Sequence, residues 1–185
     1  YKKSQYAVRK QNVTVLHIAA ENGHDGFITA LYNLFGDTID VNARDGSIRT
    51  ALMVAAKNGH ADCITALYNS YGNKIDCNAV DIDDRNALLL AASYGHADCI
   101  TALYNTYGDK IDVNAVDYYK HNALILAARN GHINCIKALY NIYGDKICSI
   151  EHRNVFMIFV KNGHSDCIKK LYSIEKSTDK QNAFM

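Results

Sequence analysis

The chain has 185 residues, of which 49% are hydrophobic and 21% are charged, and its formal net charge is +1. This balance is typical of a folded globular protein and excludes an intrinsically disordered one. No run of lysine or arginine is long enough to follow a phosphate backbone, and no apolar stretch approaches the roughly 20 residues of a membrane span. We therefore expect neither a nucleic-acid partner nor a membrane span.

One short unit is repeated along the sequence. The dipeptide Gly-His recurs five times, at spacings of 36, 36, 36 and 32 residues, and segments 50–81 and 86–117 are identical at 24 of 32 positions. Such self-similarity indicates a solenoid, in which each unit buries its apolar face against its neighbours. We predict a single domain, 1–185, with repeats at about 14–49, 50–85, 86–121, 122–153 and 154–185.

The unit at 50–85 predicts two helices and a loop. Thr50 can cap a first helix that ends at Gly59, where glycine can adopt a left-handed conformation. A second helix follows His60, carries an apolar stripe and ends at Gly72. Residues 73–85 are short, polar and turn-prone, which favours a hairpin-like excursion to the next unit.

These units resemble the ankyrin repeat. The family pattern TPLHxAAxxGH is matched by TVLHIAAENGH at 14–24, and DVNAxD is matched at 40–45 and 112–117. The resemblance implies an all-α solenoid of stacked helix-turn-helix units joined by hairpin-like loops. It also implies a non-catalytic protein that binds partners through its loop tips and the exposed side of each first helix.

Two departures from the family pattern concern the backbone. The family proline is absent from every copy and is replaced by alanine or valine; alanine, the best helix former, should keep the helix. At the hairpin tips the family glycine is replaced by Asn12, Ile48, Asp84 and Lys120. A left-handed conformation costs a β-branched residue about 1–2 kcal/mol, so we expect the tip at Ile48 to be rearranged, with its turn at Gly46.

The fifth copy differs from the others. Its connecting loop, 148–153, is four residues shorter, and bulky side chains replace the paired alanines of its first helix. We interpret this copy as a C-terminal cap in which 173–185 are frayed. The first copy looks less like a cap, and we expect the chain to be a fragment with further repeats before it.

Four cysteines, Cys63, Cys99, Cys135 and Cys167, occupy one position in successive copies. Equivalent positions in stacked helices lie about 8–10 Å apart, too far for a disulfide. Phe27 occupies this position in the first copy, so we expect a buried apolar slot. The His-x-x-Cys pairs do not bring together four zinc ligands, and a repeated core cysteine is a poor nucleophile. We expect no cofactor, and a reducing location in the cytoplasm, or in the host cytosol for an effector.

Tyrosine also recurs once per copy beside the apolar stripe, at Tyr32, Tyr68, Tyr104, Tyr140 and Tyr172, where we expect it to pack rather than to bind. Positions that vary between copies are better candidates for recognition, because tyrosine and arginine dominate binding energy at interfaces. We predict that the partner-binding residues are Arg49, Lys57, Ile82, Arg85, Tyr94, Tyr118, Tyr119, His121 and Arg129.

The sequence leaves three functions open. The leading one is a monomeric, non-catalytic module that binds a protein or peptide on its concave surface. The second is the targeting arm of a larger enzyme or secreted effector whose chemistry lies outside this segment. The third is a structural spacer between flanking domains.

Overall fold

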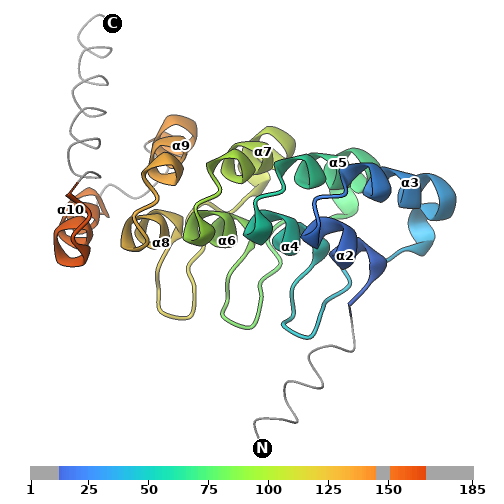
Figure 1. Ribbon diagram of the computed structural model, residues 1–185, viewed down its shortest axis with the longest axis horizontal. Coiled ribbons are helices and arrows are strands. Elements are labelled where there is room, and N and C mark those ends of the chain that lie inside the picture. The colour runs from blue at the N-terminus through green and yellow to red at the C-terminus, as the bar shows by residue number, and fades with distance from the viewer. Residues whose placement is uncertain (1–12, 145–150, 166–185) are drawn as a thin grey trace, which may run out of the picture.

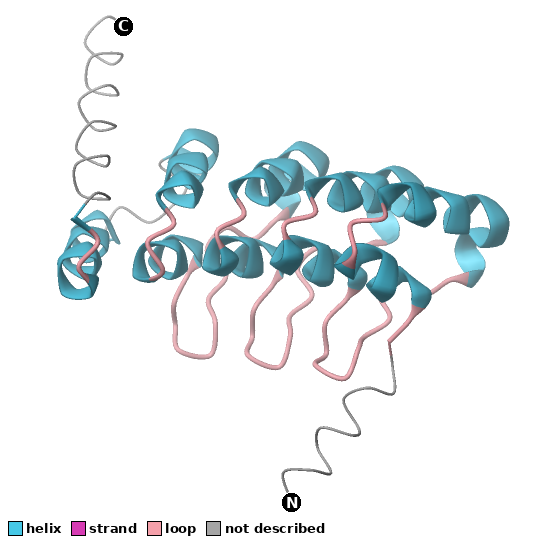
Figure 2. Cartoon of the chain, viewed as in Figure 1, coloured by secondary structure: helices cyan, strands magenta, loops and turns pink. Residues whose placement is uncertain are grey.

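The computed structural model describes residues 13–144 and 151–165, which form nine α-helices, three short 3₁₀ turns and no strand (Figures 1 and 2). The helices are α2 (Val15–Glu21), α3 (Asp25–Phe35), α4 (Ala51–Asn58), α5 (Ala61–Tyr71), α6 (Ala87–Tyr94), α7 (Ala97–Tyr107), α8 (Ala123–Arg129), α9 (Ile133–Tyr143) and α10 (Glu151–Asn162). The 3₁₀ turns follow the second helices, at Gly36–Thr38, Gly72–Lys74 and Gly108–Lys110. The predicted all-α solenoid is confirmed.

The helices form two rows. Figure 1 shows α2, α4, α6, α8 and α10 in one row, α3, α5, α7 and α9 in the other, and three long loops projecting from the first row on one side. Successive helices of each row pack on one another, and the two helices of each of the first four repeats pack together. The projecting loops and the first row of helices are therefore neighbours in space, although they alternate along the chain.

Side-chain caps start the helices of the first row. Thr50 Oγ1 accepts a hydrogen bond from the Met53 amide at 3.4 Å, and Asn86 Oδ1 accepts one from Leu89 at 2.9 Å. These helices begin at Val15, Ala51, Ala87 and Ala123, the positions of the family proline. The prediction that alanine would keep the helix is confirmed for the second, third and fourth repeats, and the first repeat keeps it with valine.

The fifth repeat starts earlier than predicted. We expected a loop up to residue 153, but α10 begins at Glu151. Segment 148–154 contains no glycine or proline, so nothing in the sequence prevents an early helix start. The predicted frayed segment 173–185, Cys167, Tyr172 and the tip at Asn12 lie outside the described residues.

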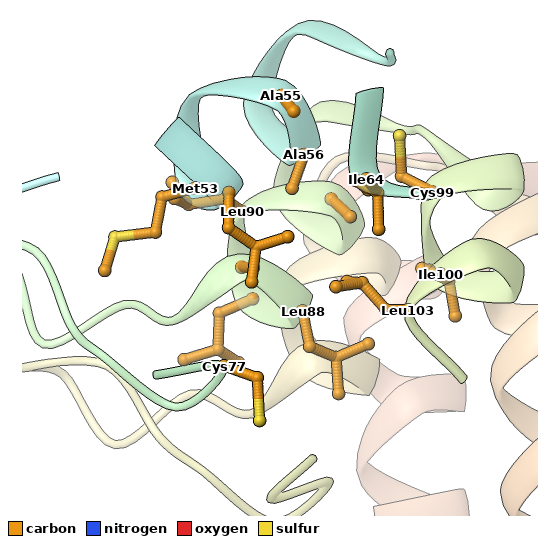
Figure 3. Close-up of a cluster of buried hydrophobic side chains, with 14 of the residues drawn as sticks. Met53, Ala55, Ala56, Ile64, Cys77, Leu88, Leu90, Cys99, Ile100 and Leu103 are labelled. Atoms are coloured by element: carbon orange, nitrogen blue, oxygen red, sulfur yellow. The ribbon is translucent and has the colours of Figure 1, made fainter. Parts of the chain in front are cut away.

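The core lies between successive helix pairs. Figure 3 shows Leu88, Ile100 and Leu103 in this core, with Ile64 and Cys99 nearby. Cys63, Cys99 and Cys135 are fully buried, which confirms the apolar slot for these copies. Phe27 is an exception, because its side chain is 55% exposed. The slot is covered by the preceding repeat, as the Cys63 thiol beside the Ala19 carbonyl shows, and Phe27 belongs to the first described repeat.

The Gly-His dipeptide joins one repeat to the next. His60, His96, His132 and His164 place Nε2 3.0–3.2 Å from a backbone oxygen near the end of the preceding first-row helix. The ring lies on the glycine of that preceding repeat: a Cβ on Gly59 would be 2.7 Å from His96 Nδ1. Glycine is therefore required both for its left-handed φ of 83° and for the close approach of this ring.

The recurrent tyrosines also connect repeats. Tyr32 packs edge-to-face on Tyr71, with ring centroids 5.0 Å apart, and Tyr68 packs in the same way on Tyr107 at 5.1 Å. Such pairs stabilise packing by about 0.5–1.5 kcal/mol beyond the area that they bury. The interpretation of these tyrosines as packing residues is confirmed for the described copies.

Candidate partner-binding surface

Each projecting loop is folded around one buried aspartate. Asp81 Oδ1 accepts hydrogen bonds from the Asp83 and Arg85 amides at 2.9 and 3.0 Å. Asp45 and Asp117 make the same pair of bonds in their own loops. All three carboxylates are buried, and charge-assisted hydrogen bonds of this kind are about twice as strong as neutral ones. The loops are therefore preorganised.

Two of the predicted binding arginines stabilise these loops. Arg49 donates from Nε and Nη2 to Asp45 Oδ2 at 2.9 and 2.6 Å, and Arg85 makes the equivalent fork to Asp81. Burial raises the pKa of the Asp45 carboxyl, but the hydrogen bonds from Arg49 and Ser47 more than offset it, so the pKa lies below its usual value. The guanidinium groups of Arg49 and Arg85 are thus hydrogen-bonded within the chain.

The loop tip at Ile48 is not rearranged, so this expectation was wrong. Ile48, Asp84 and Lys120 all adopt a left-handed conformation, with φ of 62–65°. The Ile48 amide donates to the Asp45 carbonyl at 2.9 Å, the same turn as in the other two loops. The bonds that Asp45 makes to Ser47 and Arg49 hold the backbone on both sides of Ile48, which outweighs its conformational cost.

Neighbouring tips are linked by their backbones. The Ile82 amide donates to the Ser47 carbonyl at 3.2 Å, and the Tyr118 amide donates to the Asp83 carbonyl at 3.0 Å. The third tip carries Tyr118 and Tyr119, whose side chains are 68% and 71% exposed and stack edge-to-face at 5.3 Å. Two large aromatic side chains are thus presented to solvent on an anchored loop.

His121 takes the place that arginine has in the other two loops. Its Nδ1 lies 3.2 Å from Asp117 Oδ2, and its Nε2 lies 2.6 Å from Nη1 of Arg129 on α8. Because Arg129 can only donate, a hydrogen bond between these two side chains uses Nε2 as the acceptor, and Nδ1 is then the atom that can donate to Asp117. The ring centroids of Tyr119 and His121 lie 6.0 Å apart. Tyr119 on the loop tip, His121 at the end of the loop and Arg129 on α8 therefore form one contiguous group.

The remaining predicted residues lie along the same side of the stack. Ile82 is exposed on the second tip and Tyr94 is exposed at the end of α6. Lys57, at the end of α4, places Nζ 5.4 Å from the centre of the Tyr94 ring. The structure thus joins Tyr118, Tyr119, His121 and Arg129 into one group, and Lys57 and Tyr94 into a second.

A groove beside this group was missed by the sequence reasoning. It lies between α8 and α10 and is lined in part by Ile125, Met157, Val160 and Lys161, with His121 and Arg129 at its edge. Met157 and Val160 align with Met53 and Ala56, which are buried, and so give no signal of exposure. The sequence signs that the stack changes here were the shortened loop before the fifth copy and the bulky residues that replace its paired alanines.

The described cysteines are buried thiols. Burial raises the pKa of the Cys63 thiol to about 11 and those of Cys99 and Cys135 to about 12, so these thiols are protonated at neutral pH. Within 13–144 and 151–165 no three histidine, cysteine or acidic side chains gather as metal ligands. No helix in this part is long and apolar enough to cross a membrane.

Comparison with known families agrees with this architecture. The family model for ankyrin repeats, in three copies, matches residues 2–81 and 52–151. No curated protein matches the chain. Ankyrin repeats are generally protein-interaction modules and are typically non-catalytic. Since the matched segments together span residues 2–151, the chain belongs to the ankyrin-repeat family.

Proposed function

We propose that this chain is a non-catalytic module that binds a protein partner on the surface formed by its loop tips and first-row helices, with Tyr118 and Tyr119 as the main contacts. The observation that carries the proposal is the exposure of both rings on a loop fixed by Asp117. Rigid aromatic side chains bury a large area at a small entropic cost. The free thiols of the described cysteines support action in a reducing compartment, the cytoplasm or a host cytosol.

Arg49 and Arg85 have a different part in this proposal. Because their guanidinium groups bind Asp45 and Asp81, they contribute to recognition mainly by holding the tips in position. Tyr94 and Lys57 provide a second contact area on the neighbouring helices.

Affinity capture from the source or host cell tests the proposal. Wild type is compared with the Tyr118→Ser/Tyr119→Ser variant, and Phe35→Ser is the control, since Phe35 is an exposed aromatic residue on α3, in the other helix row. We expect a protein retained by wild type and by the control but lost by the double variant, with affinity reduced at least 30-fold, equivalent to about 2 kcal/mol. Thermal unfolding should be unchanged. Equal retention by all three proteins would refute the assignment of the site.

A further inference from the structure

The groove between α8 and α10 has a volume of about 650 Å³ and exposes apolar side chains that the other repeats bury. Met157 is 62% exposed, whereas its counterpart Met53 is 1% exposed. Ile125 is half-buried, whereas its counterparts Met53 and Leu89 are buried. These two positions are therefore less covered at the junction of the fourth and fifth repeats than in the second and third repeats.

The cause of the opening lies in the fifth repeat. Bulky Phe159 and Val160 stand where the other repeats have two buried alanines. Phe159 occupies the buried position and is fully covered, while Val160 is left 55% exposed. The repeat nevertheless keeps the common register at its turn, because His164 Nε2 lies 3.1 Å from the Arg129 carbonyl oxygen.

The groove is cationic. Arg129 and Lys161 are exposed at its edge, and His121 lies between Arg129 and the tyrosine-bearing tip. Among the side chains that the structure describes, no carboxylate lines the groove. The nearest acidic group of that loop, Asp117, is buried and already bonded to two amides and to His121. An apolar floor with uncompensated positive charge at its edge is complementary to a segment that carries both bulky apolar side chains and carboxylates.

We infer that this groove binds an acidic peptide segment of the partner, with a leucine-like or aromatic side chain against Met157 and Val160 and carboxylates at Arg129 and Lys161. The inference rests on the proposed function, because the groove adjoins Tyr119 through His121 and extends the same surface. The chain's own 166–185 segment is a poor occupant, since it contains four lysines against three acidic residues.

Peptide display on the full chain, followed by fluorescence anisotropy with one selected peptide, tests the inference. We expect the selected peptides to combine acidic with large apolar residues. Met157→Ser and Lys161→Glu should each raise the Kd of that peptide at least tenfold. Lys110→Glu is the matched control, because Lys110 is an exposed lysine on the turn after α7, and it should change the Kd less than twofold. A version of the peptide with lysine in place of its acidic residues should not bind.

The outcomes separate the two proposals. If Tyr118→Ser/Tyr119→Ser weakens binding of the peptide but the groove variants do not, the proposed function stands and the groove assignment is wrong. If none of these variants weakens binding of the peptide, both the proposed function and the groove assignment fail. Selected peptides without acidic residues would overturn the charge argument. A dimer in light scattering that Met157→Ser dissociates would assign the groove to a second copy of the chain, which would also overturn the inference.

Discussion

The contact between each glycine and the histidine of the next repeat gives the sharpest test of the stacking. In Gly59→Ala the new Cβ would lie 2.7 Å from His96 Nδ1, on a residue with φ of 83°. The left-handed conformation costs alanine about 1–2 kcal/mol. Displacing His96 from the Lys57 carbonyl costs about 0.5–1.5 kcal/mol more, because that 3.0 Å hydrogen bond is lost. We therefore expect Gly59→Ala to destabilise the chain by about 1.5–3.5 kcal/mol.

Urea unfolding followed by circular dichroism measures this change, and the chain provides its own control. Gly163 has a similar φ of 72°, but a Cβ there would meet no atom of the described residues within 4 Å. Gly163→Ala should therefore cost only the backbone component, about 1–2 kcal/mol. The cost of Gly59→Ala should also fall toward that value in a His96→Ala background, since the ring is then absent. An equal cost with and without the His96 ring would refute the stacking contact.

Two further predictions concern the loops and the core. Ile48→Gly should stabilise the chain by about 1 kcal/mol in the same urea assay, because a φ of 65° is strained for isoleucine. Destabilisation would show instead that the Ile48 side chain makes an important contact. Cys99 and Cys135 should resist alkylation at pH 8 until urea unfolds the chain, as peptide mass spectrometry can show. Burial raises the pKa of both thiols from 9.0 to about 12 in the folded chain. The stability that these protonated thiols contribute is therefore retained below pH 9 and is lost as the pH rises toward 12. Rapid labelling of the folded chain would contradict their burial.

Some features of the binding surface could not be predicted from the sequence. Arg49 and Arg85 were chosen because arginine is common at interfaces, but each lies four residues after an aspartate that binds its guanidinium group. The exposure of Phe27 was missed as well, because a shared position in the repeat does not imply a shared neighbour. Met157 gave no signal for the same reason, since it aligns with the buried Met53.

The repeat register, the helix starts at Ala51 and Ala87 and the cysteine slot could all be predicted from the amino-acid sequence, because they depend on local caps and on a pattern that recurs every 36 residues. Which side chains remain available to a partner became clear from the three-dimensional arrangement of the repeats. Availability depends on contacts between residues of different repeats, such as His121 with Arg129 and α8 with α10, and on whether another repeat covers a face. A repeat pattern describes the average unit, whereas a binding surface is formed where the units differ.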